Sequence, residues 1–284
     1  MKQIICSGLP YEIGWTHGQE SKEEVRRSIH LYSDLFLEKS ALSWAQVQEL
    51  ARDFDQSISI RWPRDLNKYP LGVADGAERD ILDIIALNVR SEIVFGRFSD
   101  GCTSVYWKEN EQVYIGQNWD WVQQQQENLI QISIIQDGLP SIMMVTEAGI
   151  IGKIGLNSDG VGVCFNAIRA KGVDKSFLPV HLGLRMALES KTALAAAEEL
   201  ERIGMASSAH IMVGDKATAF GLEFTSTTFA RLPVSSDGYL IHSNHMLLKH
   251  ENIHEPKWLE DSYTRIQTME QNILQRKNLS HESF

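Results

Sequence analysis

The hydrophobic pattern of this chain changes its period at Gly101 and Cys102, and that change limits what the chain can fold into. Upstream, apolar residues recur at the i, i+4, i+7, i+11 spacing of one helix face, as in Val25, Ile29, Tyr32 and Phe36. Downstream, residues 103–107 and 112–118 are short runs rich in Val, Ile, Tyr and Thr, which are typical of strands. The sequence therefore predicts a mainly helical segment, 1–101, followed by a sheet-rich segment, 102–284.

Local signals refine the helical segment. Ser43 and Gln46 have the spacing of a capping box, and residues 81–87 indicate a buried helix. Pro63 and Pro70 are expected to interrupt the helical pattern.

The order of elements in the second segment indicates the fold class. Further strands are expected at 129–136, 141–146, 161–165, 211–213, 218–224 and 239–241. Helices are expected at 182–190, at 193–203, which Gly204 ends, and at 259–275. Residues 123–126 are expected to form a loop. Strands, then two helices, then strands suggest two sheets with helices packed outside, whereas periodicity alone specifies only a mixed α+β protein.

Composition excludes several classes of function. The net charge of −10 over 284 residues argues against a nucleic-acid or anionic-membrane partner. Three scattered cysteines are too few for a disulfide framework or a cysteine zinc site, and His17 and His30 lack ligand spacing, so both are expected to be structural or solvent-facing. No signal-peptide core, membrane span or peroxisomal C-terminal address is visible, so we expect a cytoplasmic protein.

A cysteine after a glycine at such a junction suits a self-cleaving peptide bond. The Cys102 thiol would attack the Gly101 carbonyl, and the acyl group would move from nitrogen to sulfur before water releases it. The new α-amine, with a pKa of about 7.7–8.0, could then accept the thiol proton. A lone Gly-Cys pair is weak evidence, however, because most free cysteines are small buried hydrophobes.

The surrounding sequence strengthens the argument, because it resembles the acyl-coenzyme A:6-aminopenicillanic acid acyltransferase family, also called isopenicillin N acyltransferases. The matching stretches are 10–14, 17–18, 76–80, 100–103, 116–120, 127–130, 146–153, 206–209, 211–214, 220–224 and 244–245. They occur in the family's order along nearly the whole chain. The resemblance implies an N-terminal-nucleophile (Ntn) αββα sandwich preceded by a mainly helical region.

The resemblance also assigns candidate site residues. Cys102 would be the nucleophile, and Asp120, at the far end of a predicted hairpin, would lie beside it and hold the α-ammonium and thiol in register. Asn244 matches the family's oxyanion-hole amide, and Asn166 matches a position whose backbone N–H helps to bind the oxyanion. Gln117 stands where related bile-salt and penicillin V hydrolases carry an Arg. The alternative for Asp120, Asn244 and Asn166 is that each is an ordinary turn or loop residue.

The function implied is that of a precursor cleaved before Cys102, whose 1–101 fragment stays as a subunit. Cys102 would take an acyl group from a thioester or amide and pass it to an amine or to water. No metal or redox cofactor is implied, a coenzyme A thioester would be a substrate, and the acceptor would be a β-lactam nucleus or another secondary-metabolite amine.

Two alternatives stay open at this point. One is an amidohydrolase of the penicillin V acylase and choloylglycine hydrolase type. The other is a non-catalytic remnant, because family members continue past residue 284 with a helix, further strands and an Arg of the site. The sandwich is therefore expected to be short at its C-terminal end, with part of a sheet edge uncovered.

Overall fold

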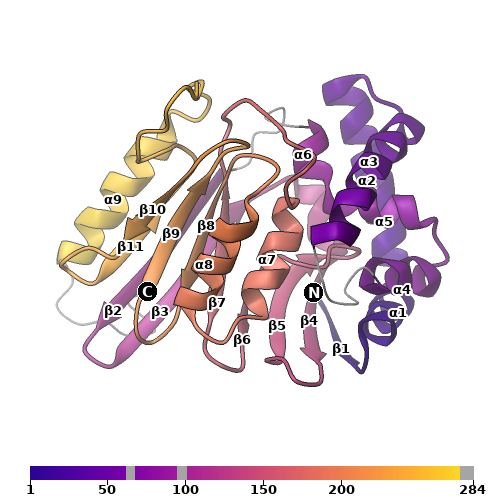
Figure 1. Cartoon of the computed structure of the whole chain (residues 1–284), viewed down its shortest axis with the longest axis horizontal. Coiled ribbons are helices and arrows are strands. Elements are labelled where there is room, and N and C mark those ends of the chain that lie inside the picture. The colour runs from indigo at the N-terminus through magenta and orange to yellow at the C-terminus, as the bar shows by residue number, and fades with distance from the viewer. Residues whose placement is uncertain (62–67, 95–100, 276–284) are drawn as a thin grey trace.

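The computed structural model describes residues 1–61, 68–94 and 101–275 of the chain (Figure 1). The first part holds one strand and a set of helices: β1 (Lys2–Ser7), α1 (Pro10–Glu20), α2 (Lys22–Ser40), α3 (Trp44–Arg61), α4 (Lys68–Ala77), α5 (Ile81–Asn88) and α6 (Arg90–Val94). Strands dominate from Gly101 onward, so the change of period at the Gly-Cys pair is a change of secondary structure. Pro63 lies outside the described residues.

Eight strands form the large sheet, in the order β1-β4-β5-β6-β7-β8-β9-β10. Those after β1 are β4 (Leu129–Ile135), β5 (Ile142–Glu147), β6 (Ile154–Asn157), β7 (Gly162–Ala167), β8 (Ala209–Gly214), β9 (Ala219–Phe224) and β10 (Phe229–Pro233). The neighbours pair antiparallel except β1 and β4, which run parallel.

The small sheet has the order β11-β2-β3, all antiparallel, and faces the large sheet. Its strands are β2 (Gly101–Glu109), β3 (Gln112–Asp120) and β11 (Tyr239–His242). Helices α7 (Val180–Leu188) and α8 (Ala193–Ile203) cover the other face of the large sheet, and α9 (Asp261–Gln275) covers the outside of the small sheet (Figure 1). The predicted αββα sandwich is thus confirmed.

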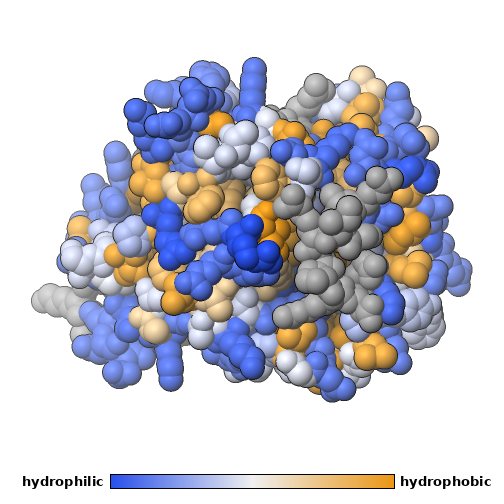
Figure 2. Space-filling view, in the orientation of Figure 1, coloured by the Kyte–Doolittle hydropathy of each residue, from blue (hydrophilic) through white to orange (hydrophobic). Residues whose placement is uncertain are grey.

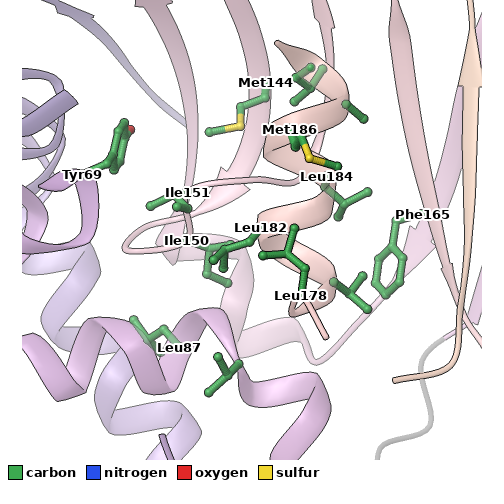
Figure 3. Packing of buried hydrophobic residues seen from close by; sticks show 14 of the residues in the cluster. Tyr69, Leu87, Met144, Ile150, Ile151, Phe165, Leu178, Leu182, Leu184 and Met186 are labelled. Carbon is green, nitrogen blue, oxygen red and sulfur yellow. The ribbon is translucent and has the colours of Figure 1, made fainter. Parts of the chain in front are cut away.

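The main core lies between the large sheet and its helices. On β4, Ile130, Ile132 and Ile134 are buried while the alternating residues are not, as a strand with one covered face requires. Figure 3 shows how this core continues: Leu87 of α5 and the loop residues Ile150 and Ile151 lie toward α7, which contributes Leu182 and Leu184 among others. Burial of this apolar surface fixes the helical segment onto the sheet.

Helices α1 and α4 pack backbone to backbone because glycines line their contact. A Cβ atom at Gly14 would lie 2.2 Å from the Tyr69 carbonyl oxygen, and one at Gly72 would lie 2.2 Å from the Tyr11 carbonyl oxygen. Only glycine permits so close an approach. Gly14 lies in one of the stretches on which the family resemblance rests.

A cavity lies along one edge of the small sheet in the described part of the chain. β3 is an edge strand, and beyond it the inner face of the large sheet borders a cavity of about 290 Å³ lined by Ile115, Met144, Leu156 and Cys164 among others. Met143 and Leu156 are about half exposed there. On the face shown in Figure 2, hydrophilic side chains are interspersed with apolar ones.

Two sequence expectations were wrong, and one strand of the mainly helical segment was missed. The missed strand is β1, of which only Ile4 and Cys6 are buried. Pro70 does not break a helix but is the third residue of α4, where its missing N–H needs no intrahelical partner. Residues 123–126 lie in a 3-10 helix, Gln123–Asn128, rather than in an irregular loop.

Other local predictions are confirmed. The Ser43 backbone N–H donates to Gln46 Oε1 at 2.9 Å and the Gln46 N–H donates to Ser43 Oγ at 3.4 Å, which is the capping box. His17 is buried against Tyr69 and the Gly149 backbone, and burial, with Arg185 nearby, lowers its pKa to about 3, as suits a structural histidine. None of the helices in 1–61, 68–94 and 101–275 has the length and apolar character to cross a bilayer.

Candidate active site

The register of the small sheet places Cys102 between the two sheets. Cys102 pairs with Trp119, and Ser104 pairs with Gln117 on one side and His242 on the other. Alternation along β2 turns Cys102, Ser104 and Tyr106 toward the large sheet; Ser104 Oγ donates to Asn166 Oδ1 on β7 at 2.6 Å. Cys102 is 2% exposed.

The other two cysteines are held as thiols. Burial raises the pKa of Cys164, and the neighbouring Cys102 raises it further, to about 12. Burial likewise raises the pKa of Cys6 to about 12. Since the thiolate is the nucleophilic form, neither residue is suited to covalent catalysis near neutral pH, which leaves Cys102 as the candidate.

Asn244 contacts the backbone of the candidate nucleophile. The Cys102 N–H donates to Asn244 Oδ1 at 2.8 Å, and Asn244 Nδ2 donates to the Ala167 carbonyl at 3.0 Å. The side chain therefore bridges β2 and the end of β7 although it lies 142 positions after Cys102. One of its two amide N–H groups is used by Ala167, and its oxyanion role stays a prediction.

Asp120 lies beside the peptide bond expected to break. It pairs with Gly101 across β2 and β3, and a Cβ atom built on Gly101 would lie 3.1 Å from Asp120 Oδ2. The hairpin thus brings Asp120 opposite Gly101, but alternation along the strands turns its side chain away from that of Cys102, so its expected role in holding the α-ammonium and thiol stays a prediction. Its exposed carboxylate lies on the side of the strand pair opposite Trp119.

Asn166 and Gln117 lie together on the inter-sheet side, one on each sheet. Asn166 Oδ1 accepts from Ser104 Oγ and from His210 Nδ1, at 2.6 and 2.9 Å, while Gln117 Oε1 accepts the Phe165 N–H at 2.6 Å. The amide nitrogens of both side chains are buried with no hydrogen-bond partner among the described residues. Both amides are therefore held by their oxygens. The backbone oxyanion role of Asn166 remains a prediction.

A buried pair of histidines, His210 and His242, contacts Asn166 through His210. The rings of His210 and His242 stack with centroids 3.5 Å apart, and His242 Nε2 lies 2.8 Å from Glu223 Oε1. Burial and the neighbouring His242 lower the pKa of His210 well below its ordinary value, so its ring is neutral. Burial alone would raise the pKa of Glu223, but the His242 hydrogen bond and two backbone N–H donors hold it below its usual value. A carboxylate thus anchors this network between β8, β9 and β11.

A second buried charge cluster lies next to Trp119. Lys153 Nζ is 4.3 Å from the centroid of a Trp119 ring and 3.0 Å from Glu147 Oε2. Glu147 also pairs with Arg90 at 2.9 Å and accepts from Tyr32 Oη. Arg90 and Tyr32 belong to the helical segment, so this carboxylate joins residues from both sides of the Gly101–Cys102 bond.

The sequence did not reveal Arg265. From α9, its Nη1 donates to the Cys102 carbonyl at 2.5 Å and to Thr103 Oγ1 at 2.9 Å, and its Nη2 donates to Asn244 Oδ1 at 2.9 Å. The only sequence signal was its i, i+4 spacing from Asp261, which is typical of a surface ion pair on a polar helix. Contacts to Cys102 depend on how α9 packs, and one sequence does not show that.

Comparison with known proteins identifies the family. Residues 107–284 match the model of the family described as "Acyl-coenzyme A:6-aminopenicillanic acid acyl-transferase". A protein of Emericella nidulans (strain FGSC A4), named "Acyl-coenzyme A:6-aminopenicillanic-acid-acyltransferase 40 kDa form", is 42% identical over 274 residues, which are 95% of this chain and 76% of that protein. The chain belongs to this acyltransferase family.

Solved structures similar to this family member include an acylase and a hydrolase. Penicillin V acylase from Agrobacterium tumefaciens matches with a TM-score of 0.32 and 12% identity over 61% of this chain and 57% of that one. A variant of conjugated bile acid hydrolase from Clostridium perfringens matches with a TM-score of 0.28 and 13% identity over 64% of this chain and 52% of that one. The chain thus spans little more than half the length of these two structures.

Within the described residues, no group of three or more His, Cys, Asp and Glu side chains is arranged to hold a metal ion. That no metal or redox cofactor takes part stays a prediction.

Proposed function

We propose that this chain is an Ntn acyltransferase that activates itself by cleavage at Gly101–Cys102 and then carries the acyl group on Cys102. The observation that carries the proposal is the convergence of Asn244 and Asp120 on the Gly101–Cys102 bond, in a member of an acyltransferase family. The Asn244 side chain hydrogen-bonds to the Cys102 N–H on one side of this peptide bond, and Asp120 pairs with Gly101 on the other.

Cleavage would need no reactant other than water. The Cys102 sulfur adds to the Gly101 carbonyl carbon, the C–N bond breaks, and the nitrogen leaves as an amine after taking a proton. Water then hydrolyses the thioester, which releases the Gly101 carboxylate and restores the thiol. The Asn244 Oδ1 that accepts the Cys102 N–H would accept from this amine afterwards. Asp120 would balance the charge of the amine when it is protonated.

Acyl transfer would use the same atoms. The α-amine takes the thiol proton, the sulfur attacks the donor carbonyl, and the coenzyme A thiolate leaves with that proton. In the second half-reaction an amine attacks the acyl-Cys102 thioester, and the amide leaves as the thiol re-forms. Donors aimed at the oxyanion, such as the remaining Asn244 N–H, typically contribute about 10²–10³ in rate.

The substrates proposed are an acyl-coenzyme A and an amine such as 6-aminopenicillanic acid, the pair in the name of the Emericella protein. Gln117, whose Oε1 accepts the Phe165 N–H, is a neutral amide where related hydrolases carry an Arg, and we expect it to suit a different acyl donor and to leave room for an amine acceptor. Water is present at about 55 M, so transfer wins only if the amine is held close to the thioester, where effective molarities exceed that value.

Intact-mass analysis of the purified chain tests the first step. Wild type should give fragments 1–101 and 102–284, Cys102→Ala should stay whole, and Cys164→Ala, a buried cysteine on the facing sheet, should cleave like wild type. An uncut wild type after long incubation would favour the non-catalytic remnant.

The processed protein then tests the second step. Thiol release from phenylacetyl-coenzyme A and octanoyl-coenzyme A should rise when a suitable amine is added, and amide should form. The amine panel must be broad and include 6-aminopenicillanic acid, because failure with one amine shows only that this amine is not the acceptor. Thiol release unaffected by every amine, with free acid as the product, would indicate the amidohydrolase instead.

A further inference from the structure

Arg265 of α9 contacts several groups of the candidate site, which the sequence did not predict. Its guanidinium donates to three acceptors, the Cys102 carbonyl, Thr103 Oγ1 and Asn244 Oδ1, at 2.5 to 2.9 Å. Its Nε donates to Asp261 Oδ2 one turn earlier on α9, at 3.0 Å. The side chain is 21% exposed, so most of it is shielded from water. A planar fork with five donors can serve all these acceptors at once, and a lysine cannot.

These contacts determine which way the Asn244 amide points. Its oxygen faces two donors, the Cys102 N–H and Arg265 Nη2, and its nitrogen faces the Ala167 carbonyl oxygen. A flipped amide would put its NH₂ group against two donors and its oxygen against another oxygen. Arg265 adds a charge-assisted hydrogen bond to the orientation seen, and such bonds are about twice as strong as neutral ones.

We propose that Arg265 is a positioning residue that fixes the Asn244 amide against Cys102, both in the precursor and in the acyl-transferring enzyme; this role rests on the proposed function. Without Arg265, Asn244 Oδ1 would keep one partner and the amide could rotate or flip. The acceptor for the Cys102 nitrogen and the amide N–H available to the oxyanion would then lose their fixed direction together. Arg265 acts through Asn244 and need not touch the substrate.

A double-mutant cycle tests this role. The variants are Arg265→Met, which keeps the length of the side chain without its charge, Arg265→Lys, Asn244→Ala, and the combination of Arg265→Met with Asn244→Ala. Arg202→Met is the matched control, because Arg202 pairs with Glu199 on the surface of α8, away from the site. The readouts are the rate of Gly101–Cys102 cleavage by intact mass, kcat and KM for thiol release from phenylacetyl-coenzyme A, and the unfolding midpoint.

Loss of one charge-assisted hydrogen bond predicts that Arg265→Met lowers kcat by about tenfold to a hundredfold. KM should change by less than about threefold. Arg265→Lys should recover only part of the loss, since it restores the charge without the fork. The combined variant should be no slower than Asn244→Ala alone within about threefold, because a residue that acts through Asn244 has nothing left to position.

Two results would overturn the positioning role alone: an Arg265→Met enzyme whose kcat stays within about threefold of an active wild type, or a combined variant whose loss equals the product of the single losses. A lowered unfolding midpoint would show that Arg265→Met misfolds rather than mispositions the amide. Arg265→Lys would then replace Arg265→Met in the double-mutant cycle. A wild type that neither cleaves nor releases thiol would instead overturn the proposed function, and this role with it.

Discussion

Replacing the buried Glu147 by glutamine is expected to destabilise the protein strongly. Glu147 is fully buried and accepts hydrogen bonds from Arg90 and Lys153, whose side chains are 7% and 3% exposed. The glutamine variant keeps the shape of the side chain but leaves two buried cations without their carboxylate. Removing one partner of a buried ion pair costs about 3–5 kcal/mol, which corresponds to a fall in Tm of about 6–20 °C for a chain of this size.

The assay is best carried out on the Cys102→Ala background, because the chain then stays whole and cleavage does not alter the transition. Thermal and urea unfolding are compared for Glu147→Gln and for Glu199→Gln, whose carboxylate pairs with Arg202 on the surface. The surface variant should lose less than about 1 kcal/mol. A Glu147→Gln protein within about 1 kcal/mol of its parent would refute the reasoning.

The pH dependence of this effect has a definite sign. Burial alone would raise the pKa of Glu147, but Arg90 and Lys153 outweigh it and hold the pKa below its ordinary value of 4.5. A carboxyl group with a lowered folded-state pKa stabilises the protein above its unfolded pKa and loses that contribution as the pH falls through the folded value. The gap in Tm between parent and Glu147→Gln should therefore be full at pH 7 and shrink in acid below about pH 4.5.

Three further changes give separate tests. Asn244→Ala should lower turnover by about 10²–10³, and a loss below roughly tenfold in the thiol-release assay would rule out its oxyanion role. Asp120→Asn should slow cleavage and turnover by about tenfold or more, because the α-ammonium loses its charged partner; an unchanged cleavage rate by mass spectrometry would leave Asp120 a turn residue. Gly14→Ala should cost about 1–3 kcal/mol in urea unfolding, since the new methyl group meets the Tyr69 carbonyl, and an unchanged midpoint would contradict that packing.

The sequence located local features well and long-range ones poorly. The hairpin that brings Asp120 to Gly101 follows from two adjacent strands, and the register confirms it. The parallel pairing of β1 with β4 and the contact of Arg265 with Cys102 join positions more than 120 residues apart, as in Lys2 with Ile130. Nothing in local periodicity encodes such pairings, because they depend on how whole layers stack.

The short strands β6 and β10 were missed for a different reason. β6 has four residues, and β10, at the edge of the large sheet, has one buried residue, Leu232. Neither gives the clear alternation that marks a strand in a sequence. For the candidate site, the family resemblance named Cys102, Asp120 and Asn244, and their roles stay predictions.

The place of β1 in the large sheet bears on how the two predicted fragments could be produced. β1 belongs to fragment 1–101, and its neighbour β4 belongs to fragment 102–284. If the larger piece were synthesised alone, it would expose the backbone of β4 as an open edge, which favours pairing with foreign strands and aggregation. Recombinant production should therefore use one uninterrupted gene, and separately expressed halves should recover activity only when they fold together.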